Sequence, residues 1–584
     1  MKYKIAENLD ENTEKELQNY PELTKKLLAN RGIKTAQEAD VFLNPDYEKH
    51  QHEPFLMKNM GKAVDRILRA IKENEKTVIF SDYDMDGIPG AVALHDFFKK
   101  IGYENFINYI PHRNREGFGL NKEAMEQFAS QNAKLLITID CGITNVKETE
   151  LANEKGIDVI ITDHHLPNLS PICEQVGGGK NPPAHAILNP KQKGDKYPFK
   201  ELCGAGIVFE LIQGVIQKGR ERDVINLPNG WEKWILDMVG IATIGDRVSL
   251  VGENRIFAHF GLKVLRKSPR VGLKKMLGKM NVNQNTITED EVGFMIGPRI
   301  NAASRMDAPD EAFNLLVTKD EIEADKISDH LNNINDQRKG FVASIIKEVK
   351  RKARLYEKKP VLIAGNLEWN PGLVGLACTN LVEEYEKPVF LWGRDEGFVI
   401  KGSCRSDGTI DLVKLMSEVN SGTLIEYGGH SFSGGFSVYH EKIHIFEEEI
   451  LLAYEKTEKF TDGENKKNFI DAELAIDDVD ENLFNQINTL APFGEGNPKP
   501  TFLFRNILLD EVLVFGKRKE HLKIGFRDDA GEKIYAINFF KTPDDFGIKK
   551  GDKISLVANI EKTSFRNISE LRLRIIDIIN SRNV

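Results

Sequence analysis

Three short apolar segments, each followed at once by acidic residues or histidines, constrain the fold of this chain more than any other feature. They read KTVIF at 76–80, AKLLITIDCG at 133–142 and GIDVIITDHHLPN at 156–168, with helix-like stretches between them. Short β-branched runs that alternate with helices predict βαβ units and a parallel sheet. Because ligands of open parallel sheets gather outside the carboxyl ends of the strands, the residues after these runs are the first candidates for a site.

The first run leads into SDYDMDGIPG at 81–90, which places aspartates on alternate positions before a glycine. Like charges this close repel one another unless a cation or several hydrogen-bond donors lie among them. The spacing also opens an EF-hand loop, but the twelfth position, counted from Asp82, is Ala93 where that loop needs glutamate. A calcium loop is therefore excluded, and another metal is expected. The acids and histidines at the three run ends are Asp82, Asp84, Asp86, Asp140, Asp163, His164 and His165.

A fourth apolar stretch, WILDMVGIATIGDRVSL, ends in Asp246. Taken alone, such an aspartate is more often a helix-end or turn residue, and a histidine pair at a strand end is often hydrogen bonded to loop backbone. Taken with the other groups, Asp246 becomes a fourth ligand group. Carboxylates with imidazole suit Mn²⁺ or Mg²⁺ better than a metal that prefers thiolates, and this number of acids suggests two ions. Such a pair can neutralise a phosphoryl oxyanion, so the expected chemistry is phosphoester hydrolysis.

Length and composition bound the remaining choices. At 584 residues the chain should hold several domains, because single cores rarely exceed about 250–300 residues. The net charge of −9 argues against a protein that coats nucleic acid through a global positive field, although a local basic groove stays open. No apolar run of about 18 residues and no apolar signal-peptide core is present, so we expect a cytoplasmic protein without a membrane segment. Five scattered cysteines without C-x-x-C spacing indicate neither a disulfide framework nor a structural zinc site.

The motifs DYDMDG, TIDCG, ITDHH and GDRVSL, in this order, resemble the successive metal motifs of the DHH phosphoesterases. FMIGPRINAASRMDAP is similar to the RecJ branch of that family, whose members are single-stranded-DNA exonucleases, and further similar segments cover nearly the whole chain. The resemblance implies that two metal ions are held by Asp82, Asp84, Asp86, Asp140, His164 and Asp246. It makes Asp140 the bridging carboxylate, and it implies catalytic roles for Asp140, Asp163, His164 and His165, with one histidine as ligand and the other beside the substrate.

The same resemblance extends past the metal motifs. In GPRINAASRM it implies that Arg299, Asn301 and Arg305 line the path of the DNA. Residues 356–456 resemble the DHH-associated domain, in which KGSCRSDG offers a fork-shaped cation flanked by hydroxyls, a combination suited to phosphate. Its YGGH segment lets backbone approach a ligand closely. The DNA-binding residues expected in this domain are Ser403, Arg405, Ser406, Gly428, Gly429 and His430.

One position of this domain departs from the family pattern. Relatives usually have a histidine before a Pro-Gly pair, where this chain has Asn370 in EWNPGLVG. Any contact made by that imidazole in relatives must be made differently here.

The C-terminal part, 467–584, has alternating β-rich runs joined by polar turns, and it resembles the RecJ oligonucleotide-binding barrel. Barrels of this kind bind single strands through basic grooves and stacking aromatic rings. Candidates for such contacts are Phe502, Phe504, Arg505, Lys517, Arg518 and Lys519, although for the two phenylalanines a place in the core is the favoured interpretation.

The predicted fold is therefore α/β: a parallel-sheet DHH catalytic domain, a second α/β DHH-associated domain and a C-terminal OB-fold β-barrel. The expected boundaries are 1–55 for an N-terminal helical lead-in, 56–320 for the catalytic domain, 321–355 for a connecting helix, 356–456 for the DHH-associated domain and 467–584 for the barrel.

The resemblance implies an exonuclease that uses two Mn²⁺ or Mg²⁺ ions to digest single-stranded DNA from the 5′ end during repair and recombination. Candidate protein partners are a single-strand-binding protein and a helicase, and no membrane partner is expected. Two alternatives stay open: a DHH phosphodiesterase of short oligoribonucleotides or nucleotides, and a catalytically silent DNA-binding scaffold.

Overall fold

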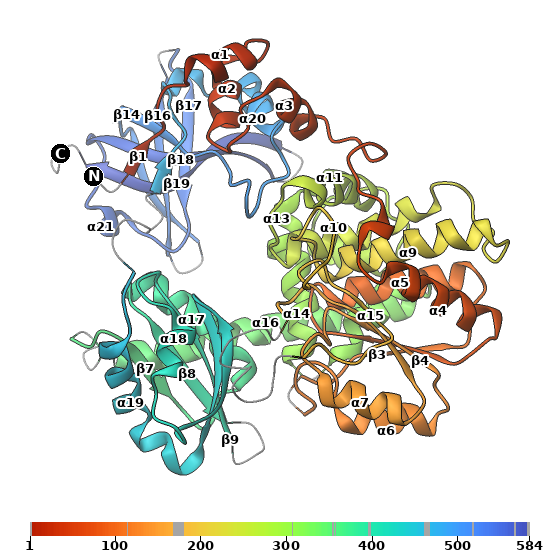
Figure 1. The fold of residues 1–584 in the computed structure, drawn as a ribbon. Helices are drawn as coiled ribbons and strands as arrows, with labels where there is room; N and C mark the ends of the chain where they lie inside the picture. The colour runs from red at the N-terminus through yellow and green to blue at the C-terminus, as the bar shows by residue number, and fades with distance from the viewer. Residues whose placement is uncertain are drawn as a thin grey trace. The chain divides into compact units, whose positions relative to one another are not determined.

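The computed structural model describes residues 3–113, 115–167, 180–306, 308–352, 356, 358–394, 399–460, 468–516, 519–528, 530–565 and 568–580 (Figure 1). The chain forms two compact units, each of which is built from separate chain segments. The larger comprises residues 53–246 and 262–465, and the smaller comprises residues 1–52, 247–261 and 466–584. Within the described ranges, no helix combines the length and the apolar character that crossing a bilayer requires.

The predicted parallel sheet is present in the larger unit. Its strand order is β3-β2-β4-β5-β6, and every pairing is parallel. The bounds are Thr77–Ser81 for β2, Phe106–Tyr109 for β3, Leu135–Ile139 for β4, Asp158–Thr162 for β5 and Ala186–Leu188 for β6. Every residue of β2 and β4 is buried, which explains why these runs are mostly apolar rather than alternating.

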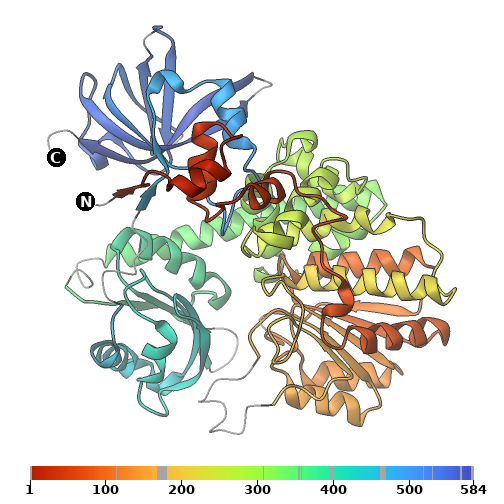
Figure 2. The ribbon, with the colours of Figure 1, turned by 45° about the horizontal axis from the view of Figure 1, so that its top comes forward.

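Helices cover both faces of this sheet, as Figures 1 and 2 show. On one face α6 (Lys122–Ser130) and α7 (Val146–Glu154) close a core that contains Phe80, Phe128 and Leu136. On the other face α5 (Gly87–Lys100) packs on α9 (Gly204–Glu221), and α4 (Met60–Lys72) packs on α9 in turn. Three layers of this kind fix the strand ends, and therefore the side chains that follow them.

A helical segment follows the sheet. Helix α10 (Leu236–Gly245) is buried from Leu236 to Ile244, so apolar residues lie on all of its sides. After it come α12 (Val271–Lys279), a π-helical turn at Val292–Ile296, α14 (Gly297–Arg305) and α15 (Pro309–Val317). The long α16 (Glu321–Arg351) packs on α12, α14 and α17, and it leads into the next sheet.

The second sheet of the larger unit has the order β10-β11-β9-β8-β7, with β7 and β8 parallel and the other pairs antiparallel. Its strands are β7 (Leu362–Gly365), β8 (Val389–Arg394), β9 (Val399–Arg405), β10 (Leu424–His430) and β11 (Ser433–Tyr439). Its helices are α17 (Pro371–Tyr385), α18 (Leu412–Ser417) and α19 (Ile443–Lys456). One hydrophobic cluster includes α17 and part of α16, and another includes α18 and α19.

In the smaller unit the expected barrel strands form one mixed sheet of order β13-β14-β18-β19-β17-β16-β15, in which the pairs β13–β14 and β17–β19 are parallel. The strands are β13 (Ala472–Glu473), β14 (Phe502–Leu508), β15 (Glu511–Phe515), β16 (His521–Arg527), β17 (Lys533–Asn538), β18 (Lys553–Phe565) and β19 (Ile568–Asn580). Among the described residues of this unit the hydrogen-bonded ladder does not close, and β13 and β15 are its edges. Only Leu509 and Asp510 separate β14 from β15, so this part of the chain reaches from near one edge to the other.

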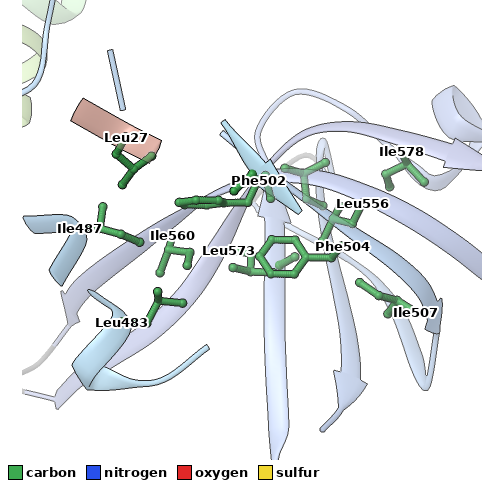
Figure 3. Close-up of a cluster of buried hydrophobic side chains, with 14 of the residues drawn as sticks. Leu27, Leu483, Ile487, Phe502, Phe504, Ile507, Leu556, Ile560, Leu573 and Ile578 are labelled. Carbon is green, nitrogen blue, oxygen red and sulfur yellow. The ribbon is translucent and has the colours of Figure 1, made fainter. Parts of the chain in front are cut away.

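The N-terminal helices share the core of this sheet. Leu27 of α2 (Glu22–Ala29) belongs to the same buried cluster as Ile487 of α20 (Glu481–Asn488) and Phe502 of β14 (Figure 3). Arg255 adds a polar link, because its Nε donates to the Phe42 carbonyl oxygen at 2.6 Å and a terminal nitrogen donates to the Ala491 carbonyl oxygen at 3.1 Å. Residues from both ends of the sequence and from its middle therefore form one unit.

Candidate metal centre

The carboxyl ends of β2, β4 and β5 bring the predicted ligands together. Asp82 follows β2, Asp140 follows β4 and His164 lies two residues after β5, while Asp246 is the C-cap of α10. Three overlapping groups have ligand atoms within 4.8 Å of one another. They are Asp82 with Asp84 and Asp140, Asp86 with His164 and Asp246, and Asp140 with His164 and His165.

His164 lies at the middle of this arrangement. Its Nε2 is 3.2 Å from Asp140 Oδ1, 3.6 Å from Asp246 Oδ2 and 3.7 Å from Asp86 Oδ2. Asp140 contributes to the first and third groups, so it is the carboxylate that reaches two neighbouring positions. A carboxylate that belongs to two neighbouring ligand groups is a candidate for bridging two ions.

The backbone of Asp140 is strained. Its φ of +59° lies in the left-handed region, which non-glycine residues seldom adopt and which occurs disproportionately at functional sites. The turn is held by a hydrogen bond from the Asp140 N–H to the Thr162 carbonyl oxygen at 2.9 Å, and by one from the Thr138 hydroxyl to the Cys141 carbonyl oxygen at 2.7 Å. The strand end is thereby fixed in a conformation that directs this carboxylate toward His164.

The first turn of α9 holds Asp86. The Gly204 N–H donates to Asp86 Oδ2 at 2.5 Å, and the Ala205 N–H donates to Oδ1 at 2.7 Å. N–H groups of the first helical turn have no acceptor within their own helix and lie at its positive end, so these two stabilise the buried carboxylate of Asp86. Gly204 has no room for a side chain, because a Cβ there would lie 2.7 Å from Asp140 Cβ and 3.0 Å from Asp140 Cα. Sequence reasoning missed Gly204, and no local pattern marks it.

The carboxylates are desolvated and repel one another. Burial and the negative charge of Asp84 raise the pKa of Asp82 well above its usual range, and burial with neighbouring aspartates does the same to Asp140. Burial and the nearby Asp86 raise the pKa of Asp246 to about 9. Burial raises the pKa of Asp86 to about 6, against the effect of the Ala205 N–H. A divalent cation among these carboxylates would offset both their mutual repulsion and the cost of burying their charges.

Two carboxylate oxygens provide an independent test of whether metal ions fit. Asp82 Oδ1 and Asp140 Oδ1 are buried, and neither accepts a hydrogen bond from any residue that the structure describes. A buried charged oxygen without a donor is costly unless a cation coordinates it. The donor set of carboxylates and one or two imidazoles suits Mn²⁺ or Mg²⁺. The residues present therefore fit divalent ions.

Asp163 and His165 form a pair beside the ligands. Asp163 is buried and accepts hydrogen bonds from the His165 N–H at 3.0 Å, from His165 Nδ1 at 2.8 Å and from the Ile143 N–H at 2.9 Å. Burial opposes protonation of His165, but the hydrogen bond and charge of Asp163 raise the pKa of its imidazole to about 9. Burial, with the nearby His165, lowers the pKa of His164 to about 3, as suits a neutral ligand. The two histidines thus have different electrostatic environments.

A group of arginines lies near the acidic cluster. Arg305, one of the predicted substrate residues, has its pKa lowered to about 9 by burial and by the charges of Arg113 and Arg338, with Asp84 acting in the opposite direction. The Arg113 guanidinium lies 4.8 Å from the Tyr83 ring centre. Three cations this close attract an anion such as a phosphate. Sequence reasoning missed Arg113 and Arg338, although HRNREG at 112–117 carries the first of them in a basic turn.

The other predicted residues of α14 are placed differently. Arg299 donates to Asn332 on α16 and to the Met295 carbonyl oxygen at 2.8 Å, so its guanidinium is engaged by protein groups. Asn301 has a buried side-chain oxygen with no hydrogen-bond partner among the described residues. Arg305 also donates to the Gly372 carbonyl oxygen of α17 at 2.6 Å, which links the helical segment to the second sheet.

Ser403 and Arg405 lie against the first half of α17. A Cβ at Gly375 would lie 3.1 Å from Ser403 Oγ and 3.4 Å from an Arg405 terminal nitrogen, so this glycine permits their close approach. Asn370 is the N-cap of α17, and its side-chain oxygen accepts from the Gly372 N–H at 2.8 Å. The asparagine that replaces the family histidine therefore stabilises the helix start.

The remaining predicted residues occupy turns and an edge strand. The Ser406 hydroxyl donates to the Ile410 carbonyl oxygen at 2.8 Å and accepts from the Gly408 N–H at 3.2 Å. Both of its hydrogen bonds therefore stabilise the turn. Gly428, Gly429 and His430 are exposed on β10. Gly429 has a φ of +137°, and a Cβ there would lie 2.3 Å from the Ser433 carbonyl oxygen, which only glycine tolerates.

The barrel candidates divide between core and surface. Phe502 and Phe504 are fully buried, so they belong to the core and cannot stack on a base. Arg505 is half exposed and pairs with Glu473 at 2.8 Å. Lys517 and Arg518 lie outside the described residues.

Comparison with known proteins agrees with this architecture. Three family models match consecutive parts of the chain: the DHH family N-terminal domain at 76–243, the DHHA1 domain at 358–456 and the RecJ OB domain at 470–577. The single-stranded-DNA-specific exonuclease RecJ of Bacillus subtilis is 33% identical over 561 residues, which cover 95% of this chain and 67% of the relative. The RecJ of Haemophilus influenzae is 28% identical and covers 95% of both chains.

Solved structures give the same answer for the fold. The crystal structure of RecJ in complex with Mn²⁺ from Thermus thermophilus superposes with a TM-score of 0.79 at 23% identity, covering 99% of this chain and 79% of that one. The sheet, its rim of acids and the matched domains define a DHH phosphoesterase. Within that class, the chain belongs to the RecJ family of single-stranded-DNA-specific exonucleases.

The close approach of α9 to Asp140 generates a first prediction. Replacing Gly204 with alanine should displace either the helix or Asp140, because the new Cβ would meet Asp140 at 2.7 Å. We expect the affinity for Mn²⁺, measured by isothermal titration calorimetry, to fall by about 10- to 100-fold. Gly278→Ala is the matched control, since that helical glycine has open space around it and alanine favours helices. Equal affinities for the two variants would contradict the proposed spacing.

The raised carboxyl pKa values generate a second prediction. A carboxyl whose pKa is higher in the folded state stabilises the metal-free protein below its unfolded pKa of about 4, and this contribution is lost as the pH rises. For Asp246 the loss extends to about pH 9. Divalent ions need the deprotonated groups, so the increase in Tm on adding Mg²⁺ should be larger at pH 8.5 than at pH 6.

At saturating Mg²⁺, each tenfold gain in apparent affinity for the ion adds about 1.4 kcal/mol to the free energy of unfolding. Differential scanning fluorimetry in chelator and in Mg²⁺ measures the increase in Tm at each pH. For Asp246→Asn this increase should depend less on pH. An increase in Tm that is equal at both pH values would rule out this account.

Proposed function

We propose that this chain is a metal-dependent exonuclease that hydrolyses single-stranded DNA from the 5′ end to mononucleotides during DNA repair and recombination. The observation that carries the proposal is the sharing of Asp140 between neighbouring ligand groups at the strand ends. The relatives support the proposal, because two proteins that are similar to this chain over 95% of its length are single-stranded-DNA-specific exonucleases. The 5′ polarity, the product and the biological setting are parts of the proposal.

Two divalent ions, Mn²⁺ or Mg²⁺, would be held by the residues of the acidic rim. Asp82, Asp84 and Asp140 would form one position, and Asp86, Asp140, His164 and Asp246 the other. When bound, such ions supply Lewis-acid stabilisation of the phosphoryl charge and lower the pKa of a coordinated water. The chain contributes the fixed positions, because α9 holds Asp86 and the strained turn holds Asp140.

Other residues would place the DNA. Arg113 and Arg305 form a cationic region near Asp84, which suits a phosphate of the strand. His165 is partly exposed and oriented by buried Asp163, so its imidazole would face the substrate and donate a hydrogen bond to a phosphate oxygen. We assign Asp163 the role of positioning this imidazole, since its own oxygens are occupied by protein donors.

Ser403 and Arg405 would bind the terminal 5′-phosphate. They lie beside the first turns of α17, whose N-terminal N–H groups and positive dipole end favour an anion. Asn370 would contribute by keeping this helix end ordered. Gly428, Gly429 and His430 would contact the backbone of the strand from exposed β10, where backbone groups are accessible. Ser406 would act indirectly, by holding the turn after Arg405.

The smaller unit would also bind single-stranded DNA. Lys523 lies 3.6 Å from the ring centre of Tyr535, and Arg574 lies 4.2 Å from that of Phe539. Phe540 is 77% exposed, with a φ of +61° that bulky residues seldom adopt. Cations paired with accessible aromatic rings are the usual means by which oligonucleotide-binding folds hold single strands. This surface replaces Phe502 and Phe504 as the stacking candidate.

Proteins that expose single strands would supply the substrate. We propose a cytoplasmic setting in which a helicase or a single-strand-binding protein delivers the DNA.

Digestion of end-labelled DNA tests the activity. With Mn²⁺ or Mg²⁺, the protein should release mononucleotides from the 5′ end of a single strand and leave duplex DNA intact. Asp140→Asn should lower the rate by more than about 100-fold, because it removes the shared negative ligand. Asp329→Asn, at an exposed helix position, is the matched control. Cleavage of short oligoribonucleotides alone would favour a related phosphodiesterase, and DNA binding without any cleavage would favour a scaffold.

The role of Arg405 is tested by the end group of the substrate. Arg405→Lys keeps the charge but loses the planar fork that binds phosphate with two parallel hydrogen bonds. We expect KM for 5′-phosphorylated DNA to rise by about 10-fold, with little change for DNA ending in a 5′-hydroxyl. Arg394→Lys, at the exposed end of β8, should change neither value. If Arg405→Lys affects both substrates equally, Arg405 binds an internal phosphate and not the terminal one.

A further inference from the structure

The loop between β3 and α6, residues 110–121, lies beside the metal centre. Of its residues, only Arg113 has a role in the proposed exonuclease function. We infer that this loop is a nucleobase-binding element and that the ring of Phe118 stacks on a base of the nucleotide held at the metal centre. The inference rests on the proposed exonuclease function and adds to it the contact that grips the base. The described part of the loop is 110–113 and 115–121.

Glu116 holds the loop in one conformation. Its carboxylate accepts from the His112 N–H at 2.6 Å, from the Tyr109 hydroxyl at 2.5 Å and from Asn121 Nδ2 at 3.1 Å. The Glu116 N–H donates back to the His112 carbonyl oxygen at 2.8 Å. One carboxylate therefore joins the end of β3, the loop and the N-cap of α6. A loop fixed in this way can present a side chain without a large loss of entropy on binding.

Two glycines direct Phe118 outward. Gly117 and Gly119 have φ values of +84° and +81°, which place the phenylalanine on a sharp turn between two left-handed residues. Asn145 secures the far side, because it accepts from the Leu120 N–H at 3.2 Å and donates to the Leu120 carbonyl oxygen at 3.3 Å. The turn is thus a fixed support for Phe118.

The ring of Phe118 lies against His165 and is half exposed. The ring centres are 5.6 Å apart at an interplanar angle of 73°, an edge-to-face contact. His165 in turn contacts His164, with ring centres 4.7 Å apart. The three rings form a series that leads from a buried ligand candidate outward to Phe118, whose exposed fraction is 50%. The exposed part of the phenyl ring is therefore close to where a scissile nucleotide would lie.

The chemistry of the ring fits a nucleobase. A phenyl group has no donor or acceptor, so it stacks on any base without reading its identity. An enzyme that digests a strand of any sequence needs such a contact, because hydrogen bonds to base edges would make its rate depend on sequence. Arg113 in the same loop supplies the cation for the phosphate, and the loop thereby offers one group for each part of a nucleotide.

The test combines Phe118 variants with DNA that lacks single bases. Wild type and Phe118→Ala are compared on a normal single strand and on strands with an abasic site at the first, second or third nucleotide from the 5′ end. If the ring stacks on a base, removing either partner should lower kcat/KM by about 5- to 150-fold. At the stacked position, removing both should cost no more than removing one. Losses that multiply at all three positions would overturn the inference.

Control variants separate stacking from packing. Phe118→Leu keeps an apolar side chain against His165 but loses the flat ring, so it should behave as Phe118→Ala does, whereas Phe118→Tyr should retain activity. Phe55→Ala changes another exposed phenylalanine, which lies beside Lys218, and should leave the abasic-site effect unchanged. If wild type fails to cut the normal strand, the exonuclease proposal itself is wrong. If wild type cuts it but the losses multiply, only the role of Phe118 is wrong.

Discussion

The two hydrogen bonds from the first turn of α9 to Asp86 are the interaction on which the arrangement of the catalytic domain depends. They place the positive end of a helix against a carboxylate with no solvent exposure, in the middle of a group of acids that repel one another. To make them, α9 must approach the strand end so closely that Gly204 touches Asp140. The same approach packs Gly90 of α5 between Ile139 of β4 and Ala205 of α9. The metal motif and the helix layer are therefore fixed by one set of contacts.

Much of this domain follows from the sequence, because the decisive information is local. Fully apolar, β-branched runs between helices specify a parallel sheet covered on both faces, and the rule that ligands gather at carboxyl strand ends then places Asp82, Asp140 and His164 at one edge. Asp246 is harder, because it follows a helix, not a strand. The sequence predicts its place in the group only when Asp246 is taken together with the other three groups of acids and histidines, since alone it suits a helix end or a turn equally well.

What the sequence does not reveal are the contacts between distant segments. Gly204 and Asp86 are 118 positions apart, and neither has a periodic pattern that points to the other. The same limit applies to Leu27, whose partners Ile487 and Phe502 come from the other end of the chain.

Phe502 illustrates a further ambiguity, because a phenylalanine in an alternating strand suits either a core or a stacking surface until the face of the strand is known. Arg113 and Phe118 were missed because their turn carries no secondary-structure signal.

The centre has a buried part, which contains Asp82, Asp86 and Asp140, and a more exposed part, which contains His165 and Phe118. One methionine connects the buried part to the neighbouring helices. The side chain of Met85, between Asp84 and Asp86, packs so tightly against Gly245 and Gly297 that a Cβ at either glycine would lie within 2.4 Å of it. Gly245 directly precedes Asp246, so this contact fixes the fourth acid relative to the first motif. Gly297 begins α14, which carries Arg305. A flexible, polarisable side chain fills this irregular space where a branched one would not. The position of Arg305 is therefore tied by packing to the acids of the first motif, while Phe118 and His165 are partly exposed.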